Sequence, residues 1–176
     1  VDYNQELDQI IISVHGLNEF WIIDHSTTTA QAATHTGGTH NKGGDFLYRW
    51  GSPNHYNRGT LADTKLWGQH NAQWIRNGLN DAGKILVFNN GFGNPDSNFS
   101  SVDIINPPVN SFGDYTILPN LPYGPDSAEW SYKAPIPTTF YSSLISGAQR
   151  LSNGNTMVSA GQYGNFFEID PSKNKV

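Results

Sequence analysis

The 176-residue sequence predicts an all-β fold, and three observations support that prediction. The apolar residues come in short runs that are rich in β-branched and aromatic side chains, and Gly, Asn or Asp bounds each run. Long amphipathic patterns with helical periodicity are missing. Eighteen Gly and ten Pro, set against a charged fraction of only 14%, indicate a chain with many turns.

The expected strands alternate with two long loops. Residues 26–45 are rich in Thr, Gly and His and predict a polar loop, whereas residues 106–137 hold most of the Pro and predict long connections. One short strand near residues 130–132 is expected to cross the second loop. The main strands are expected at residues 10–14, 20–23, 85–88 and 156–160.

A further alternating segment covers residues 46–50. Its period of two predicts that Phe46, Tyr48 and Trp50 share one face of a strand. Leu47 and Arg49 then lie on the other face. An arginine among apolar neighbours needs an anion or a carboxylate, and its planar fork suits a sulfate or phosphate oxygen. The alternative is that Arg49 reaches solvent along its own apolar stem.

The composition excludes several classes of protein. A net charge of -5 and a pI near 5.6 leave no basic footprint for nucleic acid. No apolar run approaches the roughly 20 residues that a membrane helix needs. Without Cys there is no disulfide framework, thiolate metal site or cysteine nucleophile. The chain begins at Val1 instead of Met, which indicates trimming, and no signal peptide is recognisable.

An internal repeat determines the expected architecture. The pattern A-Q-x-aliphatic-x-N-G occurs at residues 72–78 and again at residues 148–154, and each copy leads into a strand. Residues 12–24 and 158–170 form a second matching pair. A hairpin-based unit that returns about three times as successive antiparallel strands indicates β-propeller blades.

The chain holds only about 2.4 such units, and propellers close with about four to eight blades. We therefore expect a single partial β-propeller domain, a segment of a larger propeller, with blade units near residues 1–66, 67–140 and 141–176. An open array would leave unpaired strand edges exposed, which folded proteins avoid. The remaining blades are then the expected partner of this chain.

Two histidines occupy repeat positions that other copies fill with smaller residues. His70 lies two residues before the shared Ala-Gln, where the last copy has Ser146. His15 follows the 10–14 strand, where the last copy has Gly161. Both histidines are therefore expected near strand ends, where an imidazole can act as nucleophile or as general acid and base. The alternative is a histidine that hydrogen-bonds across a blade junction.

Other polar residues have simpler interpretations. Asp24 and Asp170 share one repeat position, which favours turn capping over catalysis. His35 and His40 have a spacing that metal ligands use, but without a third ligand a polar loop is favoured. Residues 94–98 place oxygen atoms at alternating positions, as calcium loops do, but lack the closing bidentate acid. No metal site is therefore predicted.

Five segments occur in an order that is typical of one family: residues 10–15, 20–24, 47–51, 68–75 and 86–91. The most specific piece is Gln69-His70-x-Ala72, followed by Phe-Asn-Asn-Gly at residues 88–91. The combination resembles the arylsulfotransferase (aryl-sulfate sulfotransferase) family over most of the chain. The resemblance implies a six-bladed propeller with its active site in the central channel.

The resemblance also implies a chemistry. In that family a histidine of the Q-H-x-A segment accepts the sulfuryl group of a phenolic sulfate ester and passes it to a second phenol, without a nucleotide sulfate donor. His70 is then the sulfohistidine nucleophile, and His15 the sulfuryl-oxygen donor or leaving-group acid. Arg49 is the nearest candidate for the family's arginine on the sulfuryl group. No cofactor is implied, and the expected partner is a small phenolic or sulfate-ester substrate, in the periplasm or outside the cell.

Candidate substrate-binding residues are amides and aromatic residues near these positions: Asn18, Asn89, Asn90, Trp50 and Trp67. Asn89 stands where the family often has Asp. Aromatic rings can hold a phenol by stacking, worth about 0.5–1.5 kcal/mol each beyond burial. Two other functions stay open, namely a non-catalytic propeller that binds a glycan or protein and an inactive fragment of the enzyme. The positions of the two histidine rings discriminate between these readings.

Overall fold

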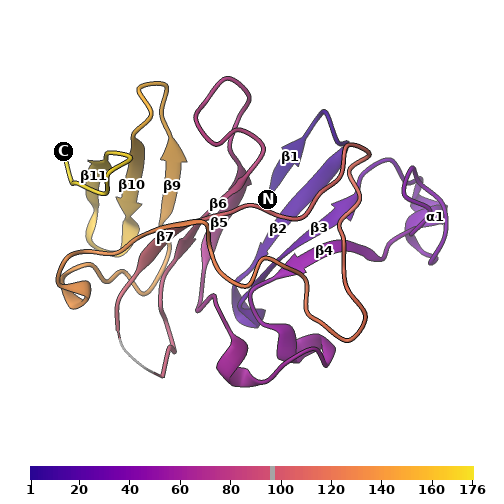
Figure 1. Cartoon of the computed structure of the whole chain (residues 1–176), viewed down its shortest axis with the longest axis horizontal. Coiled ribbons are helices and arrows are strands. Elements are labelled where there is room, and N and C mark those ends of the chain that lie inside the picture. Colours follow the sequence, from indigo (N-terminus) through magenta and orange to yellow (C-terminus); the bar gives the residue numbers. More distant parts are fainter. Residues whose placement is uncertain (96–97) are drawn as a thin grey trace.

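Three antiparallel sheets lie side by side in the computed structural model, which describes residues 1–95 and 98–176 (Figure 1). The calcium-like stretch 94–98 therefore lies partly outside the described residues. The first sheet has the order β1-β2-β3-β4, the second β5-β6-β7-β8 and the third β11-β10-β9. The strands are β1 Asp2–Asn4, β2 Gln9–Val14, β3 Glu19–Asp24, β4 Phe46–Trp50, β5 His70–Trp74, β6 Ile85–Asn89, β7 Ser101–Ile105, β8 Trp130–Tyr132, β9 Gly147–Arg150, β10 Thr156–Ala160 and β11 Asn165–Ile169.

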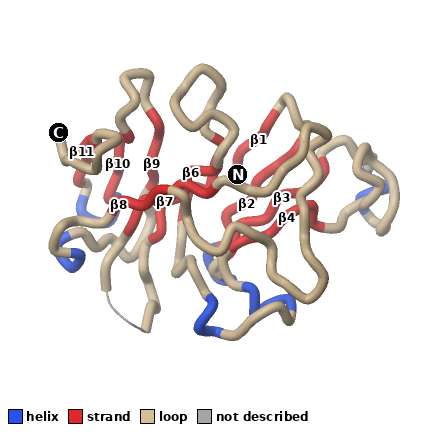
Figure 2. Tube along the Cα trace, viewed as in Figure 1, coloured by secondary structure: helices blue, strands red, loops and turns tan. Residues whose placement is uncertain are grey.

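Helix is confined to short turns between the strands (Figure 2). The single α-helix of the described residues, α1 Thr29–Ala32, lies in the polar loop predicted for residues 26–45, where Thr28 and Gln31 form a capping box. The 3-10 helices are His15–Leu17, Pro53–Tyr56, Leu61–Asp63, Pro137–Thr139 and Gly161–Tyr163. Within the described ranges, no helix has the length and apolar character to cross a membrane.

The all-β prediction is confirmed. The four main predicted strands correspond to β2, β3, β6 and β10, and the short strand predicted near residues 130–132 is β8. In each sheet, strands that follow one another in the chain are also neighbours in space. Such antiparallel meanders, packed face to face, are the arrangement found in propeller blades.

The internal repeat is visible in the backbone. In the first sheet a 3-10 helix, His15–Leu17, joins β2 to β3 and ends at Asn18 with φ 56°. In the third sheet the 3-10 helix Gly161–Tyr163 joins β10 to β11 and ends at Gly164 with φ 65°. Both end residues are left-handed, a conformation that Asn and Gly tolerate best. His15 and Gly161 are therefore structural equivalents, as the repeat predicts.

The predicted turn-capping role of the two repeated aspartates is also confirmed. The Asp24 carboxylate accepts a hydrogen bond from the Ser26 backbone at 2.9 Å. The Asp170 carboxylate accepts one from the Asn174 backbone at 2.8 Å. Each side chain therefore closes the turn that follows its strand.

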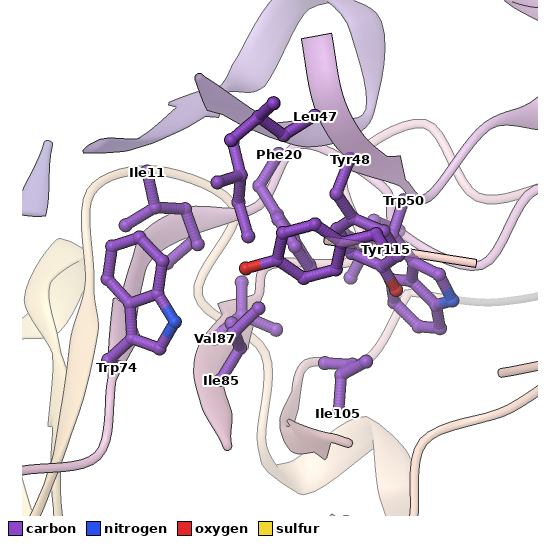
Figure 3. Packing of buried hydrophobic residues seen from close by; sticks show 13 residues of the cluster. Ile11, Phe20, Leu47, Tyr48, Trp50, Trp74, Ile85, Val87, Ile105 and Tyr115 are labelled. Atoms are coloured by element: carbon purple, nitrogen blue, oxygen red, sulfur yellow. The ribbon is translucent and has the colours of Figure 1, made fainter. Parts of the chain in front are cut away.

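Two hydrophobic clusters fill the interfaces between the sheets. One lies between the first and second sheets and includes Phe20, Tyr48 and Val87, which are fully buried (Figure 3). The other joins the second and third sheets through residues such as Phe88 and Val158. Burial of apolar side chains on both faces of the second sheet stabilises the stacking of all three.

The predicted alternation along residues 46–50 is wrong for two residues. The pairing of β3 with β4 shifts register between Ile22 and Ile23, so Leu47 turns into the core beside Tyr48. Phe46 lies on the opposite face, where the Arg49 guanidinium stands 5.4 Å from its ring centroid. A β-bulge inserts one residue and so reverses the faces beyond it, which a strict period of two cannot foresee.

Candidate active site

The ends of two neighbouring sheets bring His15 and His70 together. His15 follows β2, and His70 is the first residue of β5. Their ring centroids lie 4.9 Å apart, with an angle of 56° between the ring planes. Both rings are half-buried. Two imidazoles that sequence reasoning placed on separate blade units therefore share one small region.

Gly68 makes this close approach sterically feasible. Its φ of 62° is left-handed, and a Cβ at this position would lie 3.2 Å from His15 Nε2 and 2.9 Å from Phe92 Cβ. The Gly68 N–H donates a 2.8 Å hydrogen bond to the Asn18 side-chain oxygen. The turn that carries His15 is thus fastened to the segment that leads into His70.

Gln69 provides a second connection between the two sheets. Its side chain is fully buried and donates from Nε2 to the Glu19 carbonyl at 2.5 Å. In the other direction, Ser13 Oγ donates to the Gln69 carbonyl at 3.5 Å. Because these bonds flank both histidines, hydrogen bonds between the sheets fix the separation of the two rings.

Asn90 sets the tautomer of His70. Its Nδ2 donates to the carbonyls of Ser142 at 2.7 Å and Ile145 at 3.3 Å, so its oxygen must face His70. That oxygen lies 2.8 Å from His70 Nδ1, which therefore carries the proton. In the neutral ring the lone pair is then on Nε2. Asn90, expected to bind substrate, is fully buried and instead orients the histidine.

The protonation of His15 differs from that of a free imidazole. Burial lowers the pKa of His15 from its ordinary value of 6.5, and the nearby charge of His70 lowers it further. The pKa of His15 is lower in the folded chain than in the unfolded chain. This histidine therefore lowers the free energy of unfolding as the pH falls from about 6.5 through the folded pKa. At neutral pH the ring is mainly uncharged.

Proton NMR of the His15 ring is expected to give a titration midpoint below 6.5. His70→Asn should move that midpoint upward, because it removes the neighbouring charge, but not fully to 6.5, because burial remains. A capped histidine amide in the same buffer is the reference. A His15 midpoint at or above 6.5 in the unchanged chain would contradict this account.

Arg49 has a carboxylate partner within the protein. Its Nε and one terminal nitrogen donate to the two oxygens of Glu19 at 2.7 and 2.8 Å. Trp21 Nε1 adds a 2.7 Å bond to the same carboxylate, which is fully buried. The guanidinium also stands 4.4 Å from the Tyr56 ring centroid. The anion that the sequence requires beside Arg49 is therefore supplied by Glu19.

Three other predicted binding residues gather around a different space. Trp50, Trp67 and Asn89 line a cavity of about 450 Å³ whose lining includes neither imidazole. Trp50 is almost fully buried and donates from Nε1 to the Pro125 carbonyl at 2.8 Å. The Asn89 oxygen accepts from the Trp67 backbone at 2.8 Å, which holds the loop before β5. Their side chains stabilise the connection between the first two sheets.

The histidines of the polar loop bind separate carboxylates. His35 Nδ1 lies 2.8 Å from Asp45, and His40 Nδ1 lies 2.7 Å from Asp114. In the part of the chain that the structure describes, no group of three His, Cys, Asp or Glu side chains is placed to hold a metal ion.

Sequence reasoning missed the residues that hold the pair in place. Gly68, Gln69 and Phe92 lie beside the imidazoles; the first two belonged to the 68–75 segment of the family pattern, but no structural role was predicted for them. For Phe92, the signal that the sequence offered was an aromatic residue directly after the Asn-Asn-Gly at the end of a predicted strand.

The whole chain was compared with known proteins. A search of the curated proteins and a search of the solved structures gave no match. The family model described as Arylsulfotransferase (ASST), however, matches residues 1–176, which is the whole chain. The chain belongs to the arylsulfotransferase family.

Proposed function

We propose that this protein transfers a sulfuryl group from a phenolic sulfate ester to a phenol through a sulfohistidine at His70. The observation that supports the proposal best is the 4.9 Å ring pair in which Asn90 holds the proton on His70 Nδ1. A neutral imidazole with its lone pair on Nε2 is a nucleophile, and a second imidazole beside it can exchange a proton with the substrate.

In the proposed first half-reaction, His70 Nε2 attacks the sulfur of the ester. The N–S bond forms as the bond between sulfur and the phenolic oxygen breaks, and the electron pair of that bond leaves with the phenolate. His15, in the minority of molecules in which it is protonated at neutral pH, gives a proton to the departing oxygen. The lowered pKa of His15 makes its imidazolium a stronger acid than a free one.

The second half-reaction reverses these roles. A phenol approaches the sulfohistidine, and its hydroxyl proton passes to the now neutral His15. The phenolic oxygen forms the new bond to sulfur, and the N–S bond returns its electron pair to His70 Nε2. The cycle regenerates both histidines, and covalent catalysis of this kind divides one difficult transfer into two easier steps.

The sulfuryl oxygens need donors as charge develops on them. We assign this role to the Asn18 amide nitrogen, because the Asn18 oxygen is already held by the Gly68 N–H beside His15. Arg49 is left out of the proposed site, since two of its nitrogens bind Glu19.

The direct test is to trap the intermediate. The folded chain is incubated with 4-nitrophenyl sulfate, quenched under alkaline conditions and digested for mass spectrometry. A mass increase of about 80 Da, as covalent catalysis requires, is expected on the peptide that contains His70. The peptides that contain His25 and His35 serve as controls. A folded chain with His70 unlabelled would favour a non-catalytic binding protein or an incomplete enzyme.

Asn90→Ala is expected to lower kcat by about 10- to 100-fold with little change in KM. The variant removes the acceptor that fixes the His70 tautomer but touches no substrate, and a wrong tautomer in a serine protease triad costs up to about 10⁴-fold. Asn153→Ala, which removes an exposed amide in the turn before β10, is the matched control and should leave kcat unchanged. A rise in KM alone would indicate that Asn90 binds substrate instead.

A further inference from the structure

Phe92 is an aromatic side chain exposed directly beside the imidazole pair. It follows β6, and 51% of it is accessible to solvent. Its ring is nearly parallel to that of His15, with an interplanar angle of 27° and centroids 6.4 Å apart. The Phe92 N–H donates to the Trp67 carbonyl at 3.1 Å, which fixes the backbone from which the ring projects.

The absence of a side chain at Gly68 allows the Phe92 ring to lie close to the His15 ring. A Cβ on Gly68 would meet Phe92 Cβ at 2.9 Å and His15 Nε2 at 3.2 Å. Phe92 and His15 are therefore neighbours of one backbone position, two residues before His70. A group that rests on the open face of Phe92 lies next to the proposed reacting centre.

Further exposed apolar side chains lie at the same end of the sheets. Leu17 lies in the turn after β2, and Tyr163 lies in the equivalent turn after β10. Ile145, just before β9, approaches Gly161, and its carbonyl accepts from Asn90. Exposed apolar side chains of this kind offer surface that an apolar ligand can cover.

We propose that the aromatic ring of the substrate stacks on the Phe92 side chain, and that this contact determines the preference for aryl over smaller groups. This inference rests on the proposed function, because it names the part of that site which holds the ring. Stacking there directs the phenolic oxygen toward His15 and the sulfur toward His70. An offset aromatic pair contributes binding free energy beyond that of simple burial, so a substrate with a larger ring should bind more tightly through this contact.

The test measures binding without turnover, in a His70→Ala background. Titration calorimetry with 4-nitrophenyl sulfate should show that Phe92→Ala weakens binding about three- to tenfold. Phe92→Ala should lower the affinity for the two-ring ester 4-methylumbelliferyl sulfate by a larger factor than the affinity for the one-ring ester. Phe92→Trp should retain the affinity for both esters. The affinity of Phe92→Leu should lie between those of Phe92→Trp and Phe92→Ala. Because Phe92 is half exposed, circular dichroism is expected to confirm that all three Phe92 variants fold.

Phe112→Ala is the matched control, since Phe112 is 80% exposed in the loop that packs on the opposite end of β2. It should leave both affinities unchanged. An equal loss in Phe112→Ala, or no loss in Phe92→Ala, would overturn the inference. The labelling of His70 in the unchanged chain is a separate readout. If His70 stays unlabelled while Phe92→Ala still weakens ester binding, the proposed chemistry is wrong, but the proposed stacking of the aryl ring on Phe92 is supported.

Discussion

His70→Ala is expected to lower the rate of sulfuryl transfer by about 10³-fold or more. The substitution removes the proposed nucleophile, and loss of a nucleophile that forms a covalent intermediate costs up to about 10⁶-fold in well-studied hydrolases. The rate is measured as release of 4-nitrophenolate from 4-nitrophenyl sulfate with a second phenol present as acceptor. The alanine leaves a gap beside His15 but removes no hydrogen bond between the sheets, so the fold should persist.

His25→Ala provides the control for this experiment. His25 pairs with Asp8 at 2.7 Å on the exposed surface and has no part in the proposed site. Its removal should leave the rate within about twofold of the unchanged chain, because exposed pairs contribute little. If His70→Ala retained a tenth of the activity or more, direct transfer between the two phenols would replace the sulfohistidine mechanism.

Glu19→Ala is expected to have the largest effect on stability, a fall of about 3–5 kcal/mol in the free energy of unfolding. The carboxylate is fully buried and accepts from Arg49 and Trp21, so its removal leaves the Arg49 charge largely buried without its anion. The free energy is measured by urea denaturation followed through the tryptophan fluorescence.

The control for Glu19 is an ion pair on the surface. Glu129 pairs with Lys84 while about half of the Glu129 side chain is exposed, so Glu129→Ala should cost at most about 1 kcal/mol. The double variant Glu19→Ala with Arg49→Ala should recover part of the loss, because it also removes the unpaired charge. Equal losses for Glu19→Ala and Glu129→Ala would mean that the Glu19 carboxylate is not buried in solution.

The sequence predicted the positions of the main strands well because the fold repeats. Two copies of one local pattern placed β2, β3, β10 and β11 in equivalent positions, and the structure has them there. The helix α1 was missed because a local capping box, not hydrophobic periodicity, stabilises it. The faces of β4 were mispredicted because a β-bulge depends on the partner strand and leaves no signature in a short alternating run.

The site was predictable only in part. His15 and His70 stood out because other copies have smaller residues at their positions. The partners of Arg49 and Asn90 were not predictable, since Glu19 and Ser142 lie 30 and 52 residues away in the chain. A side chain's role depends on what reaches it across the sheets, so an arginine that suited a sulfate proved to hold a buried carboxylate.

The equivalence of His15 and Gly161 shows that this turn does not need a histidine in order to form. One backbone turn occurs twice, with an imidazole in one copy and only a hydrogen atom in the other. A Cβ at position 161 would lie 3.1 Å from Ile145, so a histidine placed there would first need that side chain to retreat. Gly161→His combined with Ile145→Ala is therefore the natural starting point for placing a second histidine at this turn. The third sheet therefore offers a position at which an imidazole can be introduced without altering His15 or His70.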